Sequence, residues 1–259
     1  MNESAGKLDR PDGAKLAWRR VEGAGPTVVW LGGFRSDMAG TKAEALADWA
    51  EAEGRAYLRF DYFGHGLSDG DFVDGTITRW RADALAVLDQ LIAGDVVLVG
   101  SSMGGWIACL AAVVRAERVK AMVLVAPAPD FTEKLMAPEI PPEGRRALRD
   151  VGVWMRPTAY GDPYPISAGL LEDGARWSML PGPIPITAPV RILQGGADAD
   201  VPWRHALELA QALNGEDVVF TLIKDGDHRL SRPQDIARLL TAVGEVYPPT
   251  ASIASKPSR

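Results

Sequence analysis

Short, mostly apolar runs alternate along this chain with longer segments of helical composition. The apolar runs lie at 27–31, 55–60, 95–100, 119–126, 189–196 and 217–223. The helical segments lie at 41–53, 78–92, 103–116, 203–213 and 235–246. Strands that are apolar on both faces are typical of a parallel sheet covered by helices on each side. The alternation therefore predicts a doubly wound α/β fold with a mostly parallel sheet.

The alternation is interrupted once, between residues 127 and 189. This stretch holds 12 of the 19 prolines of the chain, together with several tryptophans and methionines. A loop of that length without structure of its own is unusual, so we expect a small insertion with its own helices. The sequence thus predicts a core at 1–126 and 190–250, a lid insertion at 127–189 and a frayed tail at 251–259.

The length and charge of the chain exclude several classes of protein. At 259 residues it has a size that α/β folds often build as one domain. Its net charge is −6 and it has no basic run, which disfavours binding to nucleic acid or to an anionic membrane. No stretch reaches about 18 uninterrupted apolar residues, so we expect no membrane span. Residues 1–18 lack the apolar core of a signal peptide, and we expect a cytosolic protein.

Few side chains in this sequence could hold a metal ion. The chain contains one cysteine, Cys109, and three histidines, which leaves little for a zinc site. Cys109 lies within an apolar helical run, and we expect a small core residue rather than a reactive thiol. We therefore expect neither a metal nor another cofactor.

A Gly-x-Ser-x-Gly motif follows one of the apolar runs. Residues 100–104 read Gly-Ser-Ser-Met-Gly, with the strand-like DVVLVG leading in and a helical run leading out. The same motif occurs at 66–70 around Ser68, but there the following residues are typical of a loop. A nucleophile on a sharp turn needs a strand before it and a helix after it, with glycines where the chain folds tightly. We therefore predict Ser102 as the nucleophile and Ser68 as a structural hydroxyl.

A serine nucleophile needs a base within hydrogen-bond reach and a carboxylate that orients the base. In the chain order Ser, acid, His, only His205 and His228 come late enough. His228 follows a strand-like run and is predicted as the base, whereas His205 is expected at the surface or at a helix cap. Asp198, after two glycines, is the predicted acid, with Asp200 as the alternative. His65 is expected to be structural or to line the pocket.

The oxyanion hole of such a site needs two backbone N–H groups. One belongs to the residue after the nucleophile, Met103. The second is expected in the loop after the strand at 27–31, where Phe34 follows Gly32 and Gly33. These glycines would let the backbone approach the substrate oxygen.

With these residues placed, the chain resembles the α/β-hydrolase superfamily over nearly all of its length. More narrowly, it is similar to the mitochondrial palmitoyl-protein thioesterases, also known as acyl-glucuronide esterases. The resemblance rests on GTKAEAL (40–46), RFDYFGHGLSDG (59–70), LVGSSMGGW (98–106), GVW (152–154), PVRILQGGADADVPW (189–203) and DHR (227–229). It implies the α/β-hydrolase fold, with a mostly parallel sheet of about eight strands.

The resemblance implies that Ser102, Asp198 and His228 act as nucleophile, acid and base of a serine hydrolase. The substrates would be acyl thioesters or carboxylic esters of a small molecule or an acylated protein, and the enzyme would be a monomer or a homodimer. Two features depart from the family. The chain lacks a mitochondrial targeting segment, which suggests a bacterial cytosolic relative. Arg35 follows Phe34 where an apolar residue is expected, and it could favour substrates that bear a carboxylate, as in a glucuronide.

The insertion at 127–189 is expected to form a lid over an acyl pocket. Trp106, Trp154 and Met155 are the large apolar side chains expected in the walls of that pocket. Their alternative is ordinary packing in the core. A pocket of this kind predicts a preference for medium to long acyl chains.

Two other classes of function are compatible with the sequence. The same triad could hydrolyse a carbon–carbon bond or catalyse cofactor-free haloperoxidation, or the fold could be a binding module without catalysis. The complete set of triad residues argues against the binding module. A serine nucleophile argues against haloalkane dehalogenase and epoxide hydrolase, which use an aspartate there.

Overall fold

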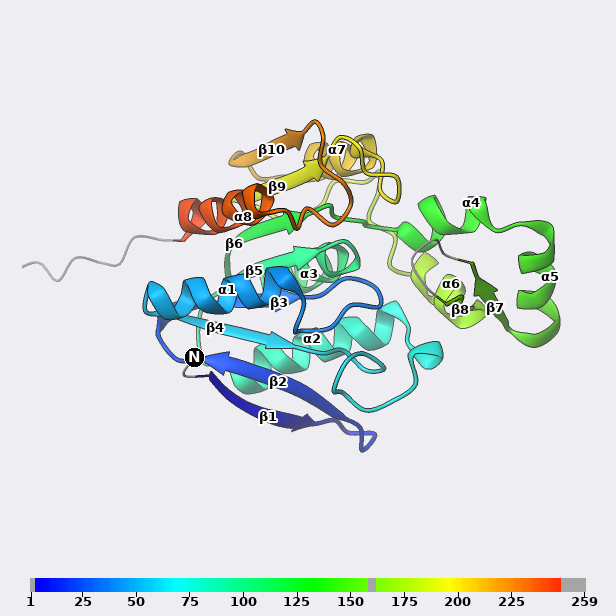
Figure 1. Ribbon diagram of the computed structural model, residues 1–259, viewed down its shortest axis with the longest axis horizontal. Helices are drawn as coiled ribbons and strands as arrows, with labels where there is room; N and C mark the ends of the chain where they lie inside the picture. Colours follow the sequence, from blue (N-terminus) through cyan, green and yellow to red (C-terminus); the bar gives the residue numbers. More distant parts are fainter. Residues whose placement is uncertain (1–2, 158–161, 248–259) are drawn as a thin grey trace, which may run out of the picture.

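The computed structural model describes residues 3–157 and 162–247. Its centre is a sheet of eight strands in the order β1-β2-β4-β3-β5-β6-β9-β10 (Figure 1). The strands are β1 Glu3–Asp9, β2 Lys15–Val21, β3 Ala24–Leu31, β4 Arg55–Phe60, β5 Val96–Ser101, β6 Val119–Val125, β9 Val190–Gly195 and β10 Val218–Ile223. The pairs from β4 to β10 are parallel, while β2 pairs antiparallel with both β1 and β4. The predicted mostly parallel sheet is therefore confirmed.

The first two strands form an antiparallel hairpin at one edge of the sheet. The alternation of apolar runs does not reveal them, because β2 reads KLAWRRV and leaves its charged side chains exposed or half-buried. An antiparallel edge strand needs only one apolar face. The buried side chain of Arg59 in β4 binds Glu3 in β1 through two N···O contacts of 2.8 and 2.7 Å, which ties the edge to the sheet.

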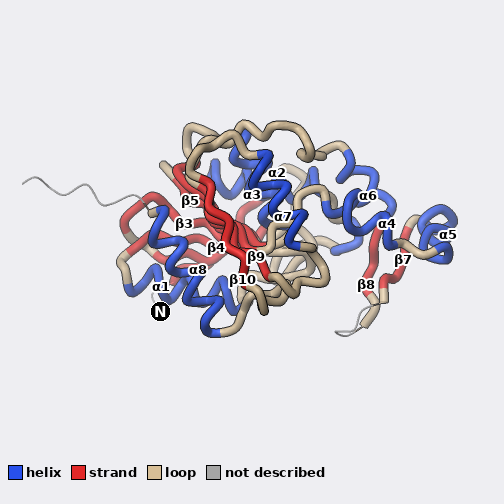
Figure 2. The backbone as a smooth tube through the Cα atoms, turned by 90° about the horizontal axis from the view of Figure 1, so that it is seen from above, coloured by secondary structure: helices blue, strands red, loops and turns tan. Residues whose placement is uncertain are grey.

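Helices cover both faces of the sheet (Figure 2). The helices of the core are α1 Thr41–Ala52, a 3₁₀ turn Phe72–Asp74, α2 Ile77–Leu91, α3 Met103–Val114, α7 Trp203–Ala212 and α8 Pro233–Val246. The side chains of β5 divide between the two faces: Val97 and Val99 pack with α1 and α8, whereas Val96 and Leu98 pack with α2, α3 and α7. Burial on both faces explains why the central strands are apolar throughout.

The segment between β6 and β9 lies beyond the carboxyl ends of the parallel strands, at the right of Figure 1. Its elements are a π-helical turn Thr132–Met136, α4 Ala137–Glu139, α5 Pro142–Val151, β7 Val153–Arg156, β8 Tyr164–Ser167 and α6 Ala168–Ala175. The expected helices are present, and β7 and β8 form an antiparallel hairpin that the sequence did not indicate. The tail predicted at 251–259 lies outside the described residues.

One buried carboxylate joins the start of this insertion to its later part, and a second fixes it to the core. Asp130, shortly after β6, accepts the backbone N–H groups of Met179 at 2.9 Å and Leu180 at 2.8 Å. Asp173 of α6 accepts the N–H of Thr78, at the start of α2, at 2.7 Å and the hydroxyl of the same residue at 2.6 Å. Buried carboxylates are stable when such hydrogen bonds replace their water. These bonds hold the insertion in one place at the end of the sheet.

Candidate active site

Ser102 lies on the sharp turn between β5 and α3. Its backbone has φ 53° and ψ −118°, a conformation that costs a residue other than glycine about 1–3 kcal/mol. The chain passes so close to itself that a Cβ on Gly100 would lie 2.5 Å from the carbonyl oxygen of Gly104. A Cβ on Gly104 would collide with the carbonyl of Leu31. The glycines of the motif therefore permit the turn that presents Ser102.

Ser68, in the second copy of the motif, has a structural place. Its hydroxyl donates to the carbonyl of Asp61 at 2.6 Å and accepts the N–H of Ala17 at 2.8 Å. These bonds join the loop after β4 to β2, as expected of a structural hydroxyl in a turn.

Ser102, His228 and Asp198 form a hydrogen-bonded chain. His228 Nε2 lies 3.1 Å from Ser102 Oγ, and His228 Nδ1 lies 2.8 Å from Asp198 Oδ2. The side chain of Asp198 is fully buried, and its Oδ1 accepts the N–H groups of Asp200 at 2.9 Å and Val201 at 2.8 Å. The structure thus brings together the three residues that the sequence singles out, in the arrangement of a nucleophile, a base and an orienting acid.

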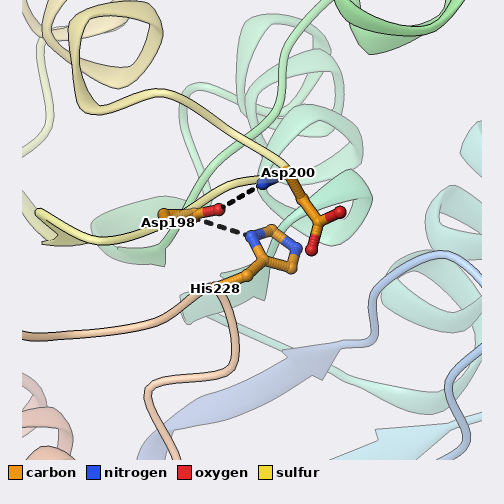
Figure 3. A group of neighbouring side chains, drawn as sticks. All are labelled: Asp198, Asp200 and His228. Atoms are coloured by element: carbon orange, nitrogen blue, oxygen red, sulfur yellow. Dashed lines mark hydrogen bonds and ion pairs between the residues drawn. The ribbon is translucent and has the colours of Figure 1, made fainter. Parts of the chain in front are cut away.

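Asp200 does not take the place of the acid, as Figure 3 shows. Its backbone N–H binds Asp198, and the carboxylate of Asp198 binds the imidazole. The side chains of Asp198, Asp200 and His228 also lie close enough to be considered as metal ligands. Their potential ligand atoms lie within 4.8 Å of one another. Hydrogen bonds already engage both oxygens of Asp198 and both ring nitrogens of His228. The triad therefore accounts for this cluster.

Gln194 of β9 is a polar residue of the site that the sequence reasoning missed. It is fully buried, and its Nε2 donates to Asp198 Oδ2 and to the carbonyl of Val201, both at 3.0 Å. Because Oδ2 is also the oxygen that binds His228, Gln194 stabilises the charge on the acid and fixes its orientation. A glutamine near the end of an otherwise apolar strand is the signal that could have revealed it.

A close approach of two loops brings the acid to the base. The N–H of Ala197 donates to the carbonyl of Gly226 at 2.9 Å. A Cβ on Gly195 would lie 2.5 Å from that same carbonyl oxygen, so glycine is needed there. The loops that follow the neighbouring parallel strands β9 and β10 therefore touch, which places Asp198 beside His228.

The glycine loop after β3 carries Phe34 and Arg35 and lines the same cavity as Ser102. The backbone N–H of Arg35 donates to Nε2 of His65 at 3.3 Å. Nδ1 of His65 lies 3.1 Å from the carbonyl of Phe63, so Nδ1 carries the proton and the ring is neutral. Burial lowers the pKa of His65, which favours this neutral form. His65 therefore supports the loop that carries Phe34 and Arg35, and it also lines a small cavity beside that loop.

His205 differs from its expected place. It is buried in the first turn of α7, and its Nε2 donates to the carbonyl of Pro129 at 2.7 Å. Burial lowers its pKa. The expectation of a surface or capping histidine is wrong, because α7 packs this side chain against the segment that leaves β6.

Two cavities share Ser102, His228 and Phe34 in their walls. The first has a volume of about 310 Å³ and lies under the insertion. Its wall combines the apolar side chains of Phe131, Leu135 and Met136 with the ring of Tyr164 and the charged side chains of Glu139, Arg156 and Asp200. The second has a volume of about 400 Å³ and lies beside the start of α1. Its charged wall includes Arg35, Asp37, Lys42 and Arg229.

The side chains expected in the walls of the acyl pocket lie elsewhere. Trp106 is fully buried within α3, and its ring lies edge to face against that of Phe131 at 5.7 Å. Trp154 is half-buried in β7 and packs over Gly144 of α5, while Met155 is 52% exposed. None of the three lines either cavity that reaches Ser102 within the described residues. The structure corrects this expectation: Trp106 and Trp154 are packing residues, and the apolar wall comes from the start of the insertion.

Arg35 does line the site. Its backbone has φ 58°, and its guanidinium lies 4.5 Å from the ring centroid of Tyr164, in the geometry of a cation–π contact. Since Tyr164 lines the cavity under the insertion and Arg35 lines the cavity beside α1, this contact forms part of the wall between the two.

Comparison with known proteins shows the family of this chain. A family model described as the alpha/beta hydrolase family matches residues 23–239. Palmitoyl-protein thioesterase ABHD10, mitochondrial, of Bos taurus is 36% identical over 248 residues, which cover 95% of this chain and 81% of the relative. The Homo sapiens protein of that name is 34% identical over 250 residues, covering 96% and 81%.

Solved structures of hydrolases are similar to this one in fold and in sequence. A structure from Agrobacterium vitis S4, described only as a hydrolase, is 43% identical, covers 95% of this chain and 100% of that chain, and has a TM-score of 0.91. Alpha/beta hydrolase domain-containing protein 10 from mouse is 35% identical, with 94% and 98% covered and a TM-score of 0.86.

In the ranges 3–157 and 162–247, no helix has the length and apolar character needed to cross a membrane. The ABHD10 relatives are named as mitochondrial. The cytosolic location expected for this chain is therefore not confirmed and stays a prediction.

Proposed function

The chain belongs to the α/β-hydrolase family, and we propose that it is a serine hydrolase that cleaves acyl thioesters and carboxylic esters through an acyl-enzyme on Ser102. The observation that carries the proposal is the hydrogen-bonded chain from Ser102 through His228 to Asp198, at the place where two cavities meet. The names of the ABHD10 relatives support a thioester substrate, offered by an acylated protein or a small molecule. The enzyme would act as a monomer or a homodimer.

In the first half of the reaction, Ser102 Oγ attacks the acyl carbon while His228 Nε2 takes up the hydroxyl proton. Asp198 stabilises the imidazolium that forms. The negative charge on the substrate oxygen would be stabilised by the N–H groups of Phe34 and Met103. Met103 is the first residue of α3, where an N–H has no partner within the helix. His228 then gives its proton to the departing thiolate or alkoxide, and the acyl group stays on Ser102.

In the second half, a water molecule takes the place of the leaving group. His228 Nε2 accepts a proton from this water as its oxygen attacks the acyl carbon. The same N–H groups stabilise the second oxyanion, and His228 returns the proton to Ser102 Oγ as the carboxylic acid leaves. Atoms and charges balance over the two steps with no cofactor in either.

We propose that the cavity under the insertion takes the acyl chain along its apolar side, beside Phe131, Leu135 and Met136. Its volume is about 310 Å³. If each methylene of an acyl chain takes about 30 Å³, the volume of one water molecule in the liquid, the cavity holds about ten carbons. We propose acyl chains of medium length as the preferred substrates, held by Phe131, Leu135 and Met136. Each buried methylene contributes about 0.8 kcal/mol, or about fourfold in affinity, until the cavity is full.

The charged cavity suits the leaving group. It presents three cationic side chains, Arg35, Lys42 and Arg229, against one carboxylate, that of Asp37. This excess of positive charge favours a leaving group that carries a carboxylate, as an acyl-glucuronide does. Such an ester is the second substrate that we propose for the same site.

A substrate panel tests the function directly. Acyl thioesters, p-nitrophenyl esters and an acyl-glucuronide are offered to the wild type and to Ser102→Ala, and release of acid is measured. We expect turnover by the wild type alone. Turnover only of a substrate with a cleavable carbon–carbon bond, or only of halide with peroxide, would favour those reactions. Failure of Ser102 to react with a fluorophosphonate would favour a binding module.

A further inference from the structure

Lys42, in the first turn of α1, reaches the loop that carries His228. Its Nζ donates to the carbonyl of Arg229 at 2.6 Å and to the hydroxyl of Ser231 at 3.2 Å, residues that lie 187 and 189 positions away in the sequence. The hydroxyl of Ser231 donates in turn to the same carbonyl at 3.1 Å. One ammonium group thus binds the segment directly after the base at two points.

An ion pair does not explain the place of this lysine, since no carboxylate of the described residues pairs with Nζ. Burial first, and the charge of Arg229 second, lower the pKa of Lys42 to about 8, while Asp227 acts in the opposite direction. An ammonium group that exchanges water for a carbonyl and a hydroxyl loses solvation energy. We infer that this loss is offset by the fixed position that the two bonds give to the segment of Arg229 and Ser231.

The bonds of Lys42 join the two loops that act on Ser102. α1 directly follows the glycine loop of Phe34, and Arg229 directly follows His228. Both partners line the cavity of about 400 Å³ that also contains Ser102. The contact therefore sets the spacing between the oxyanion loop and the base.

Other bonds hold the base loop from different sides. The carbonyl of Gly226 accepts the N–H of Ala197 at 2.9 Å and fixes the loop to the acid. Arg232 binds Asp225 at 2.7 Å where α8 begins. Lys42 is the contact from the side of the oxyanion loop. Such contacts matter because a displacement of about 1 Å at a catalytic group can lower the rate by about 100-fold.

We propose that Lys42 is a positioning residue for the hydrolysis. It holds the backbone after His228 against α1 and so keeps His228 Nε2 in reach of Ser102 Oγ and aligned with the oxyanion donors. It acts through the base loop and touches none of the reacting atoms. This proposal rests on the proposed hydrolase function.

The experiment compares three variants with the wild type in steady-state kinetics with p-nitrophenyl butyrate, an uncharged ester. Lys42→Met removes the donors at nearly constant length, and Lys42→Arg restores donors. Lys120→Met is the matched control, because Nζ of Lys120 donates to the carbonyl of Glu117 at 2.9 Å in an exposed place on the core. For Lys42→Met we expect kcat to fall about 10- to 100-fold, with KM changed less than about twofold. Lys42→Arg should recover most of kcat, and Lys120→Met should equal the wild type.

Ser231→Ala keeps the proposal testable if Lys42→Met does not fold. It removes one acceptor, and we expect a severalfold loss of kcat with KM nearly unchanged, whereas an unchanged kcat would contradict the proposal. Where Lys42→Met folds, the two losses should not add. An unchanged kcat in a folded Lys42→Met, a change confined to KM, or a loss that Lys42→Arg does not recover would overturn the proposal. Failure of the hydrolase function looks different, because the wild type would then hydrolyse no ester and Ser102 would not react with a fluorophosphonate.

Discussion

The imidazole of His65 lies beside the loop of Phe34 and Arg35 and accepts the backbone N–H of Arg35 at 3.3 Å. Its other nitrogen binds the carbonyl of Phe63 at 3.1 Å. Three aromatic rings pack edge to face around the imidazole: Tyr62, Phe72 and Trp80. His65 is thus a fixed acceptor for a loop residue whose φ is 58°. It therefore holds the loop that carries Phe34, the proposed oxyanion donor.

His65→Leu should impair catalysis by loosening this loop. The variant leaves the N–H of Arg35 without its acceptor, and the loss of such a half-buried hydrogen bond costs about 0.5–1.5 kcal/mol. We expect kcat/KM for a p-nitrophenyl ester to fall about 2- to 10-fold, which corresponds to that range. His205→Gln, which alters another buried imidazole, is the control and should keep activity close to that of the wild type. Equal losses in the two variants would show that His65 has no special link to the site.

The stability of the protein should decrease in mild acid. Burial lowers the pKa of both His65 and His205, so the unfolded chain binds protons on these rings at a higher pH than the folded chain does. The contribution of these two neutral rings to the free energy of unfolding is complete above about pH 6.5, the pKa of histidine in the unfolded chain. It is lost as the pH falls below that value. We expect the temperature at the midpoint of thermal unfolding to be lower at about pH 5.5 than at about pH 7. The decrease should be smaller in the double variant His65→Leu/His205→Gln. A midpoint that rises over this range would contradict the account.

Gln194→Met should remove a hydrogen bond to Asp198 and so impair catalysis without disturbing the packing. Met has a similar length but no donor, so Asp198 Oδ2 keeps only its bond to His228. A hydrogen bond to a charged group is worth about 1.5–3 kcal/mol, and we expect kcat to fall about tenfold or more. KM and the far-ultraviolet circular dichroism spectrum should match the wild type. Unchanged kcat would mean that Gln194 serves only the fold of the loop.

The length of the acyl chain should control the rate until the cavity under the insertion is full. We expect kcat/KM for p-nitrophenyl esters to rise up to about fourfold per methylene and to level off near about ten carbons. Leu135→Trp should lower kcat/KM for octanoyl esters and leave acetyl esters unaffected, because Leu135 lines this cavity. A flat profile from acetyl to palmitoyl esters would show that the insertion forms no acyl pocket.

The sequence predicts the parts of this site that lie directly at the ends of strands. Ser102 follows β5, Asp198 follows β9, and His228 follows β10, so a correct assignment of strands carries the residues to one edge of the sheet. The hairpin of β1 and β2 escapes the same reasoning, because an edge strand buries one face and mixes charged with apolar residues.

The environment of a side chain could not be predicted from the sequence where distant segments of the chain form that environment. The burial of His205 depends on the segment after β6, and the role of Gln194 depends on a loop that bends back over its strand. Trp106 looked like a pocket wall, yet α3 is buried on all sides along much of its length, so its tryptophan packs in the core. Such environments are set by tertiary contacts rather than by local pattern.

The acyl-enzyme itself is the most direct test of the central claim. The wild type is mixed with p-nitrophenyl octanoate, quenched in acid within the first turnovers, digested and examined by mass spectrometry. We expect an octanoyl group on the peptide that contains Ser102, absent from Ser102→Ala. In His228→Ala its formation should be slowed by about 10⁴-fold or more. Full turnover by Ser102→Ala, or an octanoyl group on the peptide of Ser68 in place of that of Ser102, would contradict the account.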